Sequence, residues 1–79
     1  MSEEATILRA IAAEYDGSAR ARTEFAAMAD GNARAPNMSP SKVSELARSA
    51  AKARLDVAHF EARAAAARAG AAALEGSAG

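Results

Sequence analysis

The sequence predicts an all-α fold, a two-helix antiparallel hairpin built as an alanine-rich coiled coil. Three observations lead to this prediction. Hydrophobic residues make up 51% of the chain, most of them alanine, the strongest helix former. One loop that contains Gly31, Pro36 and Pro40, at residues 30–41, divides the chain into arms of similar length. The second arm carries a long heptad pattern. A hairpin this small offers little core, so we expect oligomerisation or a partner to complete it.

The first arm is expected to form a helix over residues 4–30. Its apolar positions recur at helical spacing, with Leu8 and Tyr15 on the flank and Glu14 as an interruption: Ile7, Ile11, Ser18, Ala21, Phe25 and Met28. Gly17 leaves two possibilities, one helix that is straight or kinked, and a helix broken into two. Because the stripe keeps its phase across Gly17, we favour a single helix.

The connecting loop is expected at residues 31–39. Gly31 and Asn32 are residue types that adopt the left-handed conformation at the end of a helix. Pro36 and Pro40 prevent the helix from continuing, and Ser39 followed by Pro40 is typical of an N-cap and first helical position.

The second arm is expected to be helical over residues 40–70, with apolar or small residues alternating at spacings of three and four: Val43, Leu46, Ala50, Ala53, Val57, Phe60, Ala64, Ala67, Ala71 and Leu74. Folding the arms together about residue 35 predicts that Met28 meets Val43, Phe25 meets Leu46, Ile11 meets Phe60, and Ile7 with Leu8 lies over Ala64 and Ala67. The predicted seam therefore consists of Ile7, Ile11, Phe25, Met28, Val43, Leu46, Val57 and Phe60.

Residues 1–70 are expected to form the single domain, followed by a flexible tail over residues 71–79. The segment AAALE at residues 71–75 resembles a cloning-site remnant, and GSAG resembles a flexible linker. Two possibilities remain, a natural chain that ends near Gly70 and one that includes the tail.

Alanines that point away from the seam form a second apolar face on the second arm. We expect another copy or a partner helix to cover it around Leu55, Ala58, Ala62 and Ala65. The alternative is that these alanines only favour helix formation and need no partner. Charged residues at the rim complete the predicted protein-interaction site: Arg48, Lys52, Asp56, His59 and Arg63.

The residue types disfavour most kinds of chemistry. The chain has no cysteine and only one histidine, His59, and a hairpin lacks an enclosed pocket, so we expect no catalytic, metal or cofactor-binding site and no cofactor. Zero net charge disfavours a nucleic-acid partner. Arg54, Glu61 and Arg68 alternate in sign at heptad spacing, which is typical of charge matching beside a helical seam.

Localisation follows from the same patterns. Acidic residues precede the first apolar stretch where a secretory signal needs basic ones, and charges interrupt every apolar run before it reaches membrane-spanning length. We therefore expect no Sec signal peptide, no transmembrane segment and no membrane partner, and a location in the cytoplasm or in a phage particle.

The function expected from the sequence is protein binding without catalysis, by an assembly subunit or a small adaptor or chaperone that forms a homo-oligomer or binds a helical partner. The bias towards alanine and arginine suggests a GC-rich bacterial or phage genome. One alternative is a phage-encoded inhibitor that binds a host enzyme or defence complex through the charged residues named above. A third possibility is an RNA-binding hairpin.

Overall fold

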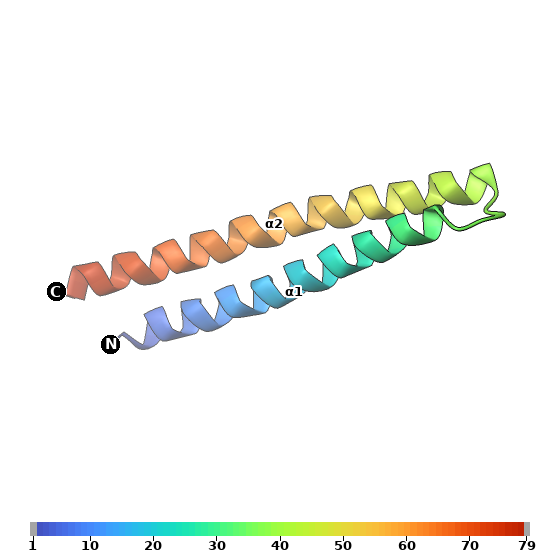
Figure 1. The fold of residues 1–79 in the computed structure, drawn as a ribbon. Helices are drawn as coiled ribbons and strands as arrows, with labels where there is room; N and C mark the ends of the chain where they lie inside the picture. Colours follow the sequence, from blue (N-terminus) through green and yellow to red (C-terminus); the bar gives the residue numbers. More distant parts are fainter. Residues whose placement is uncertain (1, 79) are drawn as a thin grey trace.

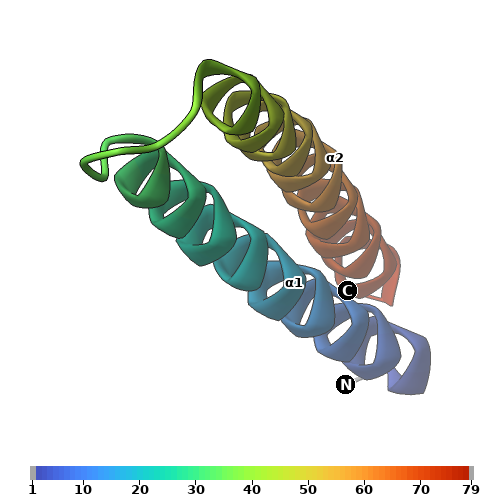
Figure 2. The same cartoon turned by 90° about the vertical axis from the view of Figure 1, so that its right-hand side faces the viewer.

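The computed structural model describes residues 2–78, and for residues 77 and 78 only the backbone. It contains two helices, α1 (Glu3–Ala33) and α2 (Pro40–Ala78), packed against each other as an antiparallel hairpin. The start of α1 and the end of α2 lie at one end of the rod and the loop lies at the other (Figure 1). The helices stay side by side along their length when the view is turned (Figure 2), and the Cα atoms extend over 62 × 13 × 11 Å. The predicted fold class is confirmed.

α1 is one continuous helix that passes through Gly17 without a break, as the phase of its pattern favoured. Ser2 is its N-cap, because the Ser2 hydroxyl accepts a hydrogen bond of 3.3 Å from the backbone N–H of Ala5. Glu3 and Glu4 lie in the first turn, where negative charge is favourable beside the helix dipole.

The loop differs from the prediction at the end of α1. Gly31 and Asn32 remain helical, and the left-handed residue is Asn37, with φ of 66°. The physical reason lies in the last turn: the N–H groups of Arg34 and Ala35 donate to the carbonyls of Gly31 and Asn32, at 3.2 and 3.1 Å. The tightened turn satisfies these carbonyls without a left-handed residue at the helix end.

The predicted start of the second helix is confirmed. α2 begins at Pro40, and the hydroxyl of Ser39 accepts a hydrogen bond of 3.2 Å from the N–H of Lys42. Proline suits this first position because its missing N–H would have no partner within the helix.

α2 ends later than predicted. It continues to Ala78, so residues 71–78 are helical where the sequence predicted that the helix would end near residue 70. Ala71 is completely buried and Leu74 is half-buried, because both continue the stripe that faces α1. Glu75 also forms an ion pair with Arg9 of α1. These contacts hold the last turns against the start of α1.

The most deeply buried positions of the seam are occupied by alanine, with larger side chains half-buried between them. Every buried hydrophobic residue in the described part of the chain is an alanine, and no larger side chain is fully buried. On α2, all positions of the predicted stripe are buried or half-buried, so that prediction is confirmed. On α1 the seam consists of Ala5, Leu8, Ala12, Tyr15, Ala19, Ala26, Ala29 and Ala33.

The seam predicted for α1 is wrong by one residue. Ile7, Ile11, Phe25 and Met28 are exposed, with 52, 36, 37 and 58% of their surface accessible. Each immediately precedes a residue of the observed seam. The reason is space: α2 already places Leu46, Val57 and Phe60 in the seam, and alanine at every seventh position of α1 lets the helices approach around these side chains.

The predicted pairing between the arms changes accordingly. Tyr15, rather than Ile11, stacks on Phe60, with ring centroids 6.1 Å apart and an interplanar angle of 27°. Leu46 packs on the cluster that includes Ala26 and Ala29, rather than on Phe25. The midpoint of the Tyr15 and Phe60 pair lies between residues 37 and 38, so the chain folds back later than residue 35 because α1 is longer than expected.

One part of the predicted pairing is confirmed. Leu8 packs on the cluster formed by Ala12, Ala64 and Ala67. It also lies close to Gly70, where an added β-carbon would be 3.4 Å from the Cδ1 atom of Leu8.

Candidate protein-binding surface

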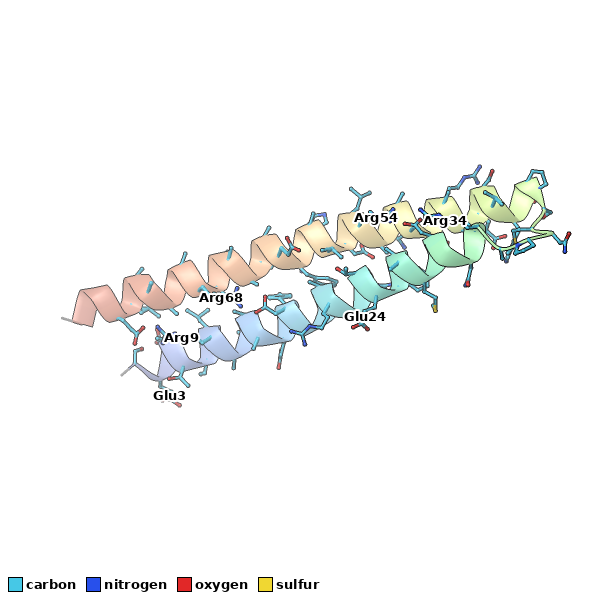
Figure 3. The ribbon with its side chains drawn as sticks, viewed as in Figure 1. Glu3, Arg9, Glu24, Arg34, Arg54 and Arg68 are labelled. Atoms are coloured by element: carbon cyan, nitrogen blue, oxygen red, sulfur yellow. The ribbon has the colours of Figure 1, made fainter. Side chains whose placement is uncertain are left out.

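One flank of the seam is closed by ion pairs between the helices. Arg9 pairs with Glu75, Asp16 with Arg68, and Asp30 with Arg54. Arg9 and Arg68 lie between the two helices, whereas Glu3 and Glu24 point away from α2 (Figure 3). We call this set the ion-pair ladder.

The ladder follows the heptad spacing of the coil. Its α1 members are seven or fourteen residues apart, as are its α2 members. The missing step falls at Thr23 and Glu61, and Glu61 makes no ion pair among the described residues. The charge matching predicted for Arg54 and Arg68 is therefore confirmed, and Glu61 lacks its counterpart.

The opposite flank of the seam exposes large apolar side chains. Ladder residues on α1 follow a seam residue by one position, whereas Ile7, Ile11, Phe25 and Met28 precede one, so the two sets lie on opposite sides of the seam. We call Ile7, Ile11, Phe25 and Met28, together with the smaller residues Ser18 and Ala21 between them, the apolar stripe of α1. Glu14 occupies the remaining position in this row.

Two contacts from α2 border the apolar stripe. The guanidinium of Arg22 lies 3.6 Å from the carboxylate of Asp56, and Arg63 lies over the ring of Tyr15 at 6.0 Å from its centroid. Both contacts cross the seam on the side away from the ladder, because their α2 members, Asp56 and Arg63, each precede a seam residue, whereas the α2 members of the ladder each follow one. This flank therefore has a charged border on α2 and an apolar row on α1.

The interaction face predicted on α2 points away from α1. Leu55 is 68% exposed, and Ala58, Ala62 and Ala65 are exposed beside it at alternating spacings of three and four. The structure brings these four residues together on one face. Among the residues that the structure describes, none covers them.

The charged residues of the predicted site do not form one free cluster. Arg48, Lys52 and His59 are exposed. Asp56 is half-buried against Arg22, and Arg63 contacts Tyr15, so both are engaged with α1. Three of the five predicted rim residues are therefore exposed to solvent, and the other two contact α1 beside the apolar stripe.

The apolar stripe was not predicted as a surface, because its large side chains were expected to lie in the hairpin's own seam. Two signals could have identified it. Glu14 and Ser18 interrupt the stripe, whereas a buried seam tolerates few polar residues. The neighbouring frame places alanine at every seventh position from Ala5 to Ala26 without interruption.

A shallow groove lies on the ladder side of the seam, with a volume of about 270 Å³, and is lined by Thr23, Ala26, Ala27, Asp30, Arg54 and Val57. The carboxylate and guanidinium in its wall pair with each other. Within residues 2–78, no group of histidine and acidic side chains is arranged to hold a metal ion. Neither described helix has the combination of length and apolarity that a bilayer span requires.

In comparisons with known proteins, no family model, curated protein or solved structure matches the chain at a significant level.

Proposed function

We propose that this hairpin is a non-enzymatic protein-binding module, an assembly subunit or a small adaptor or chaperone, that binds through the apolar stripe of α1. The proposal rests mainly on where α1 places its small and its large apolar side chains. Alanines face inwards, while Ile7, Ile11, Phe25 and Met28 face solvent. Complete burial of a fully exposed side chain of this kind is favourable by roughly 1.5–3 kcal/mol, and a partner would provide the share that corresponds to the surface still exposed in the hairpin.

The spacing of the stripe favours a helical partner. Its positions alternate by three and four residues over most of α1, which is the pattern that fits a second helix. The residues in its middle, Ser18 and Ala21, are small and permit close approach of a partner backbone.

The face around Leu55 is proposed as a second, weaker contact. Its alanines contribute about one methyl group each, so their burial is worth less than that of the α1 stripe. The inhibitor and RNA-binding alternatives remain predictions. The engagement of Asp56 and Arg63 with α1 removes them from a free charged face, which gives less support to an inhibitor that binds through it.

The proposal can be tested by replacing Phe25 with a photo-crosslinking phenylalanine derivative. Ala27 is the matched control, since it is exposed two residues further along the same helix and faces another direction. Irradiation in source cells should give covalent protein adducts from position 25 and few from position 27. Equal yields at both positions, or no adduct at position 25, would show that the stripe is not a binding surface.

A further inference from the structure

We propose that the occupant of the apolar stripe is a second copy of this chain, with the two α1 helices antiparallel and a two-fold axis passing close to Ser18. This inference rests on the proposed function, because it names the partner of the same surface. It is carried by the way in which the residues of α1 are arranged about their centre.

The large side chains are placed almost symmetrically about Ser18, which is the middle residue of α1. Ile11 and Phe25 are each seven residues from Ser18. Ile7 and Met28 are eleven and ten residues from it. A two-fold axis at Ser18 therefore places Ile7 and Ile11 of one copy opposite Phe25 and Met28 of the other. A self-complementary interface requires this kind of arrangement.

Two residues of opposite charge, Glu14 within the row of the stripe and Arg22 beside it, are also placed symmetrically about Ser18. Glu14 lies four residues before Ser18 and Arg22 lies four residues after it. The two-fold axis brings each glutamate level with the arginine of the other copy, twice per dimer. A parallel pairing would instead place Glu14 beside Glu14, which is unfavourable.

Both charged groups are available for this contact. Glu14 is exposed and makes no ion pair within the described hairpin. Arg22 touches Asp56 at 3.6 Å, yet half of its side chain, 50%, remains accessible. An exposed guanidinium with several N–H donors can serve a second carboxylate.

The centre of the stripe also suits a crossing of two helices. Gly17, Ser18 and Ala21 are small and exposed, and a β-carbon added at Gly17 would meet nothing within 4 Å. The α2 residues that border the stripe are Lys52, Asp56, His59 and Arg63. Pairing α1 with α1 thus buries apolar against apolar, whereas pairing α1 with this bordering flank of α2 in another copy would bury charged side chains.

The chain has no cysteine, so single cysteines report the position of the axis directly. In Ser18→Cys the two thiols lie next to the axis, and mild oxidation should convert the protein rapidly into a disulfide-linked dimer. Ala10→Cys is the control, because its thiols would be about 24 Å apart in the same dimer. We expect at least tenfold faster dimer formation for Ser18→Cys than for Ala10→Cys, and equal rates would overturn the proposed axis.

A charge exchange tests the orientation in otherwise unchanged protein. Glu14→Lys or Arg22→Glu alone should weaken the dimer measured by light scattering, and the double variant should restore it. Circular dichroism of each variant checks that the hairpin stays helical. Failure of the double variant to recover, with helicity intact, would contradict the pairing of Glu14 with Arg22.

The two proposals fail in distinguishable ways. Photo-adducts at position 25 with the mass of two chains support the second copy. Adducts of any other mass, combined with slow Ser18→Cys oxidation, would refute the second copy while leaving protein binding in place. An absence of adducts at position 25 would refute both.

Discussion

Ala12 and Ala50 show how closely the helices of this hairpin pack. Their exposed fractions are 1 and 0%, and Ala12 lies in a row of alanines at heptad spacing. A larger side chain at such a position must force the helices apart or adopt a strained rotamer.

Ala12→Leu is therefore expected to destabilise the hairpin by about 1–3 kcal/mol, because leucine overpacks the seam. Ala13→Leu is the matched control at an exposed neighbouring position and should change the free energy of unfolding by less than about 0.5 kcal/mol. Urea unfolding followed by circular dichroism measures both. If Ala12→Leu left the free energy of unfolding unchanged, the seam would have space for a larger side chain, which would contradict close packing.

Gly17 is the clearest site for stabilisation. It lies inside α1 with a negative φ, and an added β-carbon would contact nothing within 4 Å. Gly17→Ala should raise the free energy of unfolding by about 0.5–1 kcal/mol, because alanine loses less backbone entropy in a helix. Urea midpoints at a fixed low concentration test this, and a lower midpoint for the variant would contradict the continuous helix.

At the scale of the helices, the missing step of the ion-pair ladder provides a test of their register. Thr23→Arg should give Glu61 its counterpart, with a coupling free energy of about 0.2–1 kcal/mol typical of an exposed pair. A double-mutant cycle with Glu61→Gln separates this coupling from the better helix propensity of arginine. The coupling should vanish near 1 M salt, where the Debye length is about 3 Å. Zero coupling at low salt would contradict the register.

The two helices differ in how far the sequence could predict them. In α2 the large residues Leu46, Val57 and Phe60 share one stripe with the alanines, so apolar size and seam position coincide. In α1 they are one residue apart. A search for large apolar residues selects the heptad positions of Ile11 and Phe25. The positions that face α2 are instead occupied mainly by alanines, whose small side chains allow α2 to pack close to α1.

The end of α2 was mispredicted for a related reason. Glycine, serine and a linker-like composition after Leu74 suggested a flexible tail. The length of α1 decides otherwise, since its first turns extend beside residues 71–75 and supply Arg9 as the partner of Glu75. Local composition carries no information about such a partner. The same holds for the proposed binding surface, because its exposure depends on the rotation of α1 about its axis.

For the whole molecule, a core of alanines alone limits the stability of a single hairpin. If two copies share their apolar stripes, folding is coupled to association, so the thermal midpoint should rise with protein concentration. Phe25→Ala should lower the midpoint at high concentration and largely remove its concentration dependence. Ala27→Ser, at an exposed position outside the stripe, should keep that dependence. Calorimetry over a hundredfold concentration range would measure both, and a wild-type midpoint independent of concentration would contradict self-association.

The central claim is that α1 turns its alanines towards α2 and its large side chains away. Disulfide formation within one hairpin tests it most directly, in the pair Ala12→Cys with Ala64→Cys against the pair Ile11→Cys with Phe60→Cys. The first pair joins residues of one buried cluster. The second joins residues that only the rejected seam would bring together. We predict rapid intramolecular closure of the 12 and 64 pair and slow closure of the 11 and 60 pair. The reverse order of rates would show that the isoleucines face inwards and would contradict the account.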